Sequence, residues 1–150
     1  MVKVELRKFN IVDYFRFLLL TLNKDYSREL DNTFFGYIFK GIKSLFLKKK
    51  YYKFAILVDD KFAGSIALYY NKDTNYELGF IVLRKYRNKG IATEASKKIL
   101  DFGFNKLKLK KIIAITDISN KTSQRVLRKL GFKIIKENKK EKEFIWEKRK

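Results

Sequence analysis

The stretch from Tyr76 to Phe102 constrains the fold most, because it turns an apolar strand into an amphipathic helix through a short basic loop. Residues 76–83 have the composition of a strand, with Gly79 in its interior, where a glycine often marks a bulge or a close approach. In the following helix, apolar residues recur on one face at Ile91, Ala95, Ile99 and Phe102. The loop between them presents backbone N–H groups at the positive end of a helix, and therefore suits a phosphate or pyrophosphate group.

The rest of the chain predicts one α/β domain, residues 1–150, in which strands and helices surround this stretch. Strands are expected at 2–7, 51–58, 62–70, 76–83, 111–118, 132–135 and 144–146. Helices are expected after an N-cap at Asn10, from Phe34 to Phe46, from Ile91 to Phe102, and after Asn120. The order is roughly βααβββαβαββ, which describes a mixed central sheet.

The composition excludes several kinds of chemistry. The chain has neither cysteine nor histidine, so disulfides, thiolate nucleophiles and zinc–thiolate sites are excluded, and proton transfer must use carboxylates, Tyr, Lys, hydroxyls or water. Asp59 and Asp60 stand between two expected strands, so they are interpreted as turn residues rather than metal ligands. No metal is therefore expected.

The formal charge of +20 favours polyanionic partners, such as nucleic acid or the ribosome, or a phosphorylated cofactor. Lysines are scattered through every segment, so a general compositional bias explains the charge equally well. The apolar run from Phe15 to Leu22 is much shorter than the about 20 residues that span a bilayer. It lies behind Glu5 and Asp13, unlike a signal sequence, so a cytoplasmic protein without membrane contact is expected.

Two short motifs, each at the start of an expected helix, point to a family. The first is Arg87-Asn88-Lys89-Gly90-Ile91-Ala92, and the second combines Asn120 and Ser123 with Leu130-Gly131-Phe132. At these positions in the element order, they resemble the motifs of the GNAT N-acetyltransferase superfamily. With Glu77-Leu78-Gly79-Phe80 on the preceding strand, the chain looks most similar to the subgroup that includes the ribosomal-protein N-terminal acetyltransferases.

The resemblance implies the acyl-CoA N-acyltransferase fold with a bulged or splayed strand, and acetyl-CoA as co-substrate. Gly90 and Ala92 keep the loop free of bulky side chains, so that N–H groups can approach the coenzyme A pyrophosphate. The pantetheine arm would lie beside the strand near Ile81 and Val82. The residues expected to contact acetyl-CoA are Ile81, Val82, Arg87, Asn88, Lys89, Gly90, Ile91, Ala92, Thr93, Asn120 and Ser123. The Walker pattern and the three-glycine dinucleotide fingerprint are both absent.

Proton transfer has several candidate groups. Glu77 is the expected general base, directly or through water, with Asp117 as the alternative. Ser123 matches the serine of the subgroup, which implies contact with the sulfur region, although a first-turn serine can also stabilise a helix. Many relatives place a tyrosine acid four residues later, where this chain has Leu127.

The function expected is direct transfer of an acetyl group from acetyl-CoA to a primary amine, without a covalent enzyme intermediate. The acceptor expected is a protein N-terminus, such as that of a ribosomal protein, or a small-molecule amine, and the positive charge favours a peptide over a polycation. The alternative is a binding module for nucleic acid or the ribosome that keeps the fold without turnover. A monomer and a homodimer are both compatible with the sequence.

Overall fold

The computed structural model describes residues 3–22, 51–72 and 75–150. The chain divides into two compact units, residues 1–8 with 52–150 and residues 9–51, which are described separately. The helix expected from Phe34 to Phe46 lies outside the described residues. A single domain over residues 1–150 stays a prediction.

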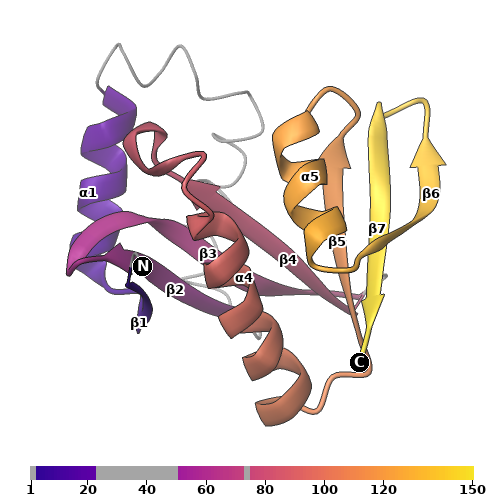
Figure 1. The fold of residues 1–150 in the computed structure, drawn as a ribbon, viewed down its shortest axis with the longest axis horizontal. Helices are drawn as coiled ribbons and strands as arrows, with labels where there is room; N and C mark the ends of the chain where they lie inside the picture. Colours follow the sequence, from indigo (N-terminus) through magenta and orange to yellow (C-terminus); the bar gives the residue numbers. More distant parts are fainter. Residues whose placement is uncertain (1–2, 23–50, 73–74) are drawn as a thin grey trace. The chain divides into compact units, whose positions relative to one another are not determined.

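The larger unit is built on a sheet of seven strands in the order β1-β2-β3-β4-β5-β7-β6 (Figure 1). The strands are β1 (Val4–Lys8), β2 (Tyr51–Val58), β3 (Lys61–Asn71), β4 (Asn75–Val82), β5 (Lys111–Asp117), β6 (Lys133–Asn138) and β7 (Glu143–Arg149). Strands β4 and β5 are parallel, whereas the other described pairs are antiparallel, so the predicted mixed sheet is confirmed. The two closing strands are longer than the sequence pattern predicted.

The turn between β2 and β3 consists of Asp59 and Asp60, which both have left-handed backbone conformations with φ of 47° and 62°. Two successive residues of this kind fit a two-residue hairpin, because the turn then twists in the same sense as its strands. Aspartate tolerates this conformation better than most side chains. The interpretation of these carboxylates as turn residues is confirmed.

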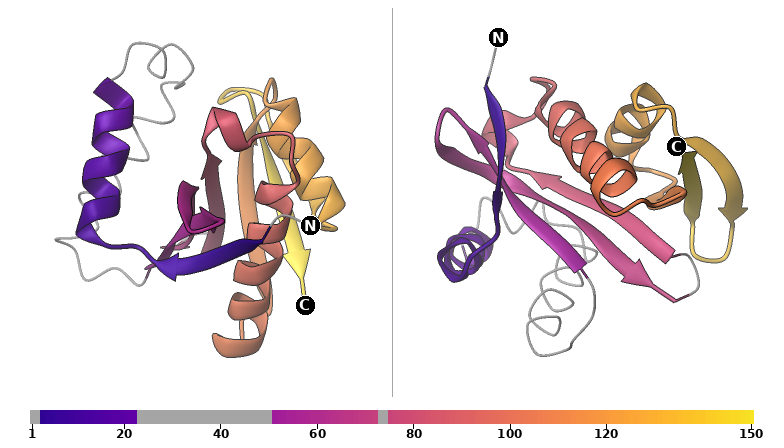
Figure 2. Two further views of the ribbon diagram at one scale, coloured as in Figure 1. Left: turned by 60° about the vertical axis from the view of Figure 1, so that its left-hand side comes forward. Right: turned by 90° about the horizontal axis from the view of Figure 1, so that it is seen from below.

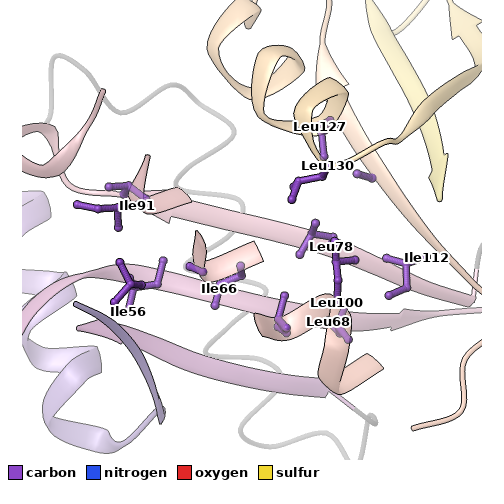
Figure 3. Packing of buried hydrophobic residues seen from close by; sticks show 14 of the residues in the cluster. Ile56, Ile66, Leu68, Leu78, Ile91, Leu100, Ile112, Leu127 and Leu130 are labelled. Carbon is purple, nitrogen blue, oxygen red and sulfur yellow. The ribbon is translucent and has the colours of Figure 1, made fainter. Parts of the chain in front are cut away.

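Two helices, α4 (Ile91–Asp101) and α5 (Lys121–Lys129), cover one face of the sheet (Figure 2). A short π-helix, η2 (Phe102–Lys106), continues α4. Of the predicted inner face, Ile91, Ala95 and Ile99 are buried, whereas Phe102 lies in η2 and is partly buried against the core. Leu127 of α5 and its C-cap Leu130 belong to the same core. Figure 3 shows Ile91, Leu127 and Leu130 in one cluster with Leu78 of β4 and Ile112 of β5, together with Ile56, Ile66 and Leu68.

The smaller unit contains α1 (Ile11–Leu22), which begins where the sequence predicts. Asn10 Oδ1 accepts a hydrogen bond from the Asp13 N–H at 3.0 Å, and Asp13 Oδ2 accepts one from the Asn10 N–H at 2.9 Å. This reciprocal pair caps the helix. Three apolar residues of the predicted helical pattern, Val12, Phe15 and Leu19, are exposed. Within the described residues, no helix is long and apolar enough to span a bilayer.

Candidate functional site

The sheet opens between β4 and β5. These strands are paired only at Glu77 and Ile113, near the start of each strand, and Figure 1 shows them separating from there. On its other side β4 keeps an unbroken register with β3, including Ala67 opposite Gly79. The strand therefore splays from β5, and the bulge considered at Gly79 is not found in its pairing with β3.

The direction of the main-chain groups of β4 decides which of them face the opening. The Ile81 carbonyl oxygen points to β3, because a Cβ built on Gly64 would lie 2.1 Å from it. The Leu83 N–H also faces β3, donating to the Ala63 carbonyl at 2.8 Å. Since successive residues of a strand point their N–H and C=O groups to opposite sides, Phe80 and Val82 face β5.

Of the two residues expected beside the pantetheine arm, Val82 has its main-chain groups on the side of the opening, whereas those of Ile81 face β3. Phe80, which the sequence pattern did not single out, also has its main-chain groups on the side of the opening. A sequence pattern can predict that a strand alternates, but not which set of residues faces which neighbouring strand. The side chain of Ile81 shares a face with Glu77, opposite the face covered by α4.

The loop after β4 turns back onto the end of that strand. It contains a short 3₁₀ helix, η1 (Arg84–Tyr86), and its Arg87 Nε donates to the Val82 carbonyl oxygen at 3.0 Å. Arg87 is among the residues expected to contact acetyl-CoA. Its side chain also fastens the loop to β4, which fixes where the next residues begin.

The loop ends in a run of unpaired N–H groups. Within the described residues, the backbone N–H groups from Asn88 to Thr93 have no hydrogen-bond partner. Asn88 and Gly90 have left-handed conformations, with φ of 60° and 75°, and Gly90 occupies the N-cap of α4 without a side-chain cap. The positive end of the helix dipole is thus open, which is the arrangement that binds phosphate groups.

The second helix begins at the same edge of the sheet, because it follows β5, which is parallel to β4. Asn120 caps α5, its Oδ1 accepting from the Ser123 N–H at 3.0 Å, so the predicted capping role is confirmed. The Ser123 side chain is half-buried, and its hydroxyl makes no hydrogen bond within the part of the chain described. In open parallel arrangements, ligands bind beyond the carboxyl ends of strands at such a divergence.

The acid–base candidates lie in different surroundings. Glu77 is half-buried at the closed end of the splay. Asp117 instead ends β5 and accepts hydrogen bonds from the Ser119 hydroxyl and N–H, which lower the pKa of its carboxyl. Leu127, at the position where relatives carry a tyrosine, is buried in the core. Among the described residues no cluster of three or more carboxylates could hold a metal ion.

The family follows from a model of the acetyltransferase (GNAT) domain, which matches residues 5–133 and so includes both motifs and the splayed strands. The chain belongs to this GNAT family. Its sequence relatives include an uncharacterized N-acetyltransferase, YnaD, of Bacillus subtilis, which is 37% identical over 54% of this chain and 49% of the relative. Spermidine N(1)-acetyltransferase of Escherichia coli K12 is 33% identical over 55% of this chain and 45% of that enzyme. The matched part thus spans about half the length of these GNAT relatives.

Solved GNAT structures match the whole chain. An acetyltransferase of the GNAT family from Bacillus anthracis is 26% identical, with a TM-score of 0.75 over 99% of this chain and 98% of that one. Campylobacter jejuni PseH, solved in complex with acetyl coenzyme A, is 17% identical with a TM-score of 0.69 over 99% of both chains. A ribosomal-protein-S5-alanine acetyltransferase of Vibrio fischeri is 18% identical, with a TM-score of 0.75 over 99% of this chain and 96% of that one. The GNAT fold predicted from the motifs is confirmed.

Proposed function

We propose that the protein is an N-acetyltransferase that transfers the acetyl group of acetyl-CoA directly to a primary amine. The observation that carries this proposal is the open row of N–H groups from Asn88 to Thr93, placed at the end of β4 where the strands have separated. A diphosphate meets both the fixed donors and the helix dipole there. Lys89, exposed in the same loop, adds positive charge beside it.

The splay provides a place for the rest of the cofactor. The outward-facing groups of β4 are the N–H and C=O of Phe80 and the N–H of Val82, since the Val82 carbonyl is already bonded to Arg87. An extended arm with amide groups can add to this strand as a further strand would. Ser123 of α5 and its N-cap Asn120 would contact the cofactor from the other side, since α5 begins at the same edge of the sheet.

Distances along the strand support a position of the thioester near Glu77. Five residues separate Glu77 from Val82, which at about 3.3 Å per residue corresponds to roughly 16 Å. The pantetheine arm has about thirteen bonds between phosphorus and sulfur, and at about 3.5 Å for three bonds of an extended chain it spans roughly 15 Å. A diphosphate held beyond Val82 therefore brings the thioester toward the closed end of the splay, where Glu77 lies.

The transfer needs one base and one acid. The amine nitrogen attacks the thioester carbonyl, the new C–N bond forms as the C–S bond breaks, and the thiolate leaves with the electron pair. Glu77 takes the proton of the attacking amine, directly or through water, and the thiolate receives a proton through the hydroxyl of Ser123, which regains one from solvent. An N–H of β4, at Phe80 or Val82, stabilises the developing oxyanion.

The acceptor is a primary amine, and we favour a peptide N-terminus over a polycation. The charge of +20 disfavours the approach of a polyamine more than that of a peptide bearing one amino group. Relatives of both kinds exist, since the matches include a spermidine acetyltransferase and a ribosomal-protein acetyltransferase.

A transfer assay tests this function. Thiol release from acetyl-CoA is followed with peptides that have free N-termini, with the same peptides blocked at the N-terminus, and with spermidine. We expect peptides with a free N-terminus to increase the rate of thiol release, and the blocked peptides to give no such increase. Salt-sensitive RNA binding with no acetyl transfer to any amine would instead favour the alternative binding module.

A further inference from the structure

The only glutamine of the chain, Gln124, is 1% exposed and lies in the first turns of α5. Its Nε2 donates two hydrogen bonds, to the carbonyl oxygen of Asp117 at 3.1 Å and to that of Ile118 at 2.9 Å. These carbonyls belong to the end of β5 and the residue after it. One buried side chain therefore ties the start of the helix to the end of the strand that precedes it.

The acceptor end of Gln124 is held as well. Arg128, one turn later in α5, approaches the Gln124 Oε1 with its Nη2 at 3.4 Å. The guanidinium of Arg128 lies over the ring of Trp146 on β7, 5.4 Å from the ring centre. Trp146 in turn donates from Nε1 to Thr116 Oγ1 on β5 at 2.8 Å, in the interior. The amide orientation of Gln124 is thus fixed from both sides.

We propose that Gln124 is a positioning residue for the cofactor site, holding the first turn of α5 so that Asn120 and Ser123 face the opening between β4 and β5. This rests on the proposed function for the role of those two residues. The physical reason is that, within the described residues, the other hydrogen bonds of this turn are local bonds between residues 117 and 124, apart from the Ile118 N–H to the Lys142 carbonyl oxygen, so the two bonds of Gln124 are the ones that tie the interior face of α5 to the end of β5. Without them the Ile118 carbonyl oxygen would lose its donor, whereas the Asp117 carbonyl oxygen would keep the Asn120 N–H. A loosened turn would let Asn120 and Ser123 shift together.

The test uses Gln124→Met, which keeps the length and apolar bulk of the side chain but removes both N–H donors. The affinity for acetyl-CoA, measured by calorimetry, should fall about tenfold, which corresponds to the loss of the two hydrogen bonds that hold the turn. The KM for acetyl-CoA should rise in parallel, whereas the KM for the amine should stay within about twofold. The fluorescence of Trp146, the only tryptophan, should keep the emission of a buried ring and so verify the fold.

The matched control is Leu130→Ala, at the far end of α5, which removes core packing without touching Asp117 or Ile118. It should lower the unfolding midpoint at least as much and leave the acetyl-CoA affinity within about twofold. Amide hydrogen exchange, which needs no ligand, should accelerate about tenfold at residues 121–124 in Gln124→Met, beyond the rise in the control.

Unchanged exchange at residues 121–124 in Gln124→Met overturns the positioning role. Equal losses of acetyl-CoA affinity in Gln124→Met and Leu130→Ala overturn it too, because the effect would then reflect stability alone. If the unmodified protein binds no acetyl-CoA, the proposed function fails, and the exchange measurement still decides whether Gln124 holds the turn.

Discussion

The Nε of Arg87 lies 3.0 Å from the carbonyl oxygen of Val82 and donates a hydrogen bond to it, five residues back along the chain. This bond closes the loop after β4 and places its N–H groups at the mouth of the splay. The residue that a family motif marks as a source of charge therefore also has a mechanical role. Substitutions can separate the effect of this hydrogen bond on acetyl-CoA binding from the effect of the positive charge of Arg87.

Arg87→Met should weaken acetyl-CoA binding about fivefold or more, because the loop loses its link to β4 and the site loses a charge. Lys89→Met is the matched control, since Lys89 is exposed in the same loop and supplies charge. The loss in the Lys89 variant should shrink at high salt, whereas most of the loss in the Arg87 variant should persist. Titrations at low and high ionic strength check this. If high salt reduces the loss of acetyl-CoA affinity equally in the two variants, Arg87 acts through its charge alone.

Gly64→Ala should lower the free energy of unfolding by about 2 kcal/mol or more, because the added Cβ would lie 2.1 Å from the Ile81 carbonyl oxygen. Backbone cannot move aside as a flexible side chain can. Gly103→Ala is the control, since its Cβ would meet the side-chain ends of Ile112 and Leu68 at 2.9 and 3.1 Å. Urea unfolding of both variants should show a larger decrease in the free energy of unfolding for Gly64→Ala than for Gly103→Ala. The reverse order would contradict the close approach of β3 and β4.

Glu77→Gln should reduce kcat by about 10²-fold or more while leaving the affinity for acetyl-CoA unchanged, because the amide cannot accept the amine proton. Glu94→Gln is a fair comparison, since Glu94 is an exposed carboxylate on α4 that pairs with Lys97. Steady-state kinetics and calorimetry on both variants separate turnover from binding. Full activity of Glu77→Gln across the pH range would remove it as the base.

Asp117 should titrate below its ordinary value of 3.8, because hydrogen bonds from Ser119 stabilise its carboxylate. A carboxyl whose pKa is lower in the folded state stabilises the fold above its unfolded pKa, and this contribution is lost as the pH falls through the folded value. Ser119→Ala removes the hydroxyl donor, so the pKa should move back toward 3.8. Carboxyl NMR titration measures both. An unshifted pKa in the unmodified protein would leave Asp117 open as the base.

The local features could be predicted from the sequence because each depends on neighbouring residues. The hydrogen bond from the Ser123 N–H to the Asn120 side chain joins residues three positions apart, and the Asp59-Asp60 turn involves two adjacent residues. The strand and helix order follows in the same way from periodic patterns. These are the parts of the site that the motifs describe.

The remaining features depend on contacts between distant segments. Whether Phe80 or Ile81 faces the opening depends on which side of β4 pairs with β3, and no local pattern records this. The bond of Arg87 to Val82 and the two bonds of Gln124 require the folded loop around them. Leu127 illustrates the opposite case, because it is an apolar residue of an amphipathic helix and its side chain is buried in the core.

The most direct test of the central claim is a calorimetric titration of the protein with acetyl-CoA, repeated on Gly90→Val. A Cβ at Gly90 would meet no atom within 4 Å, so the added side chain does not clash with the fold, but it adds bulk to the loop that presents the N–H groups, and the left-handed φ adds about 1–2 kcal/mol of strain. We predict binding in the range of about tens of micromolar or tighter, and a loss of about tenfold or more in the variant. Absence of binding by the unmodified protein, or equal affinity in the variant, would contradict the assignment of this loop as the diphosphate site.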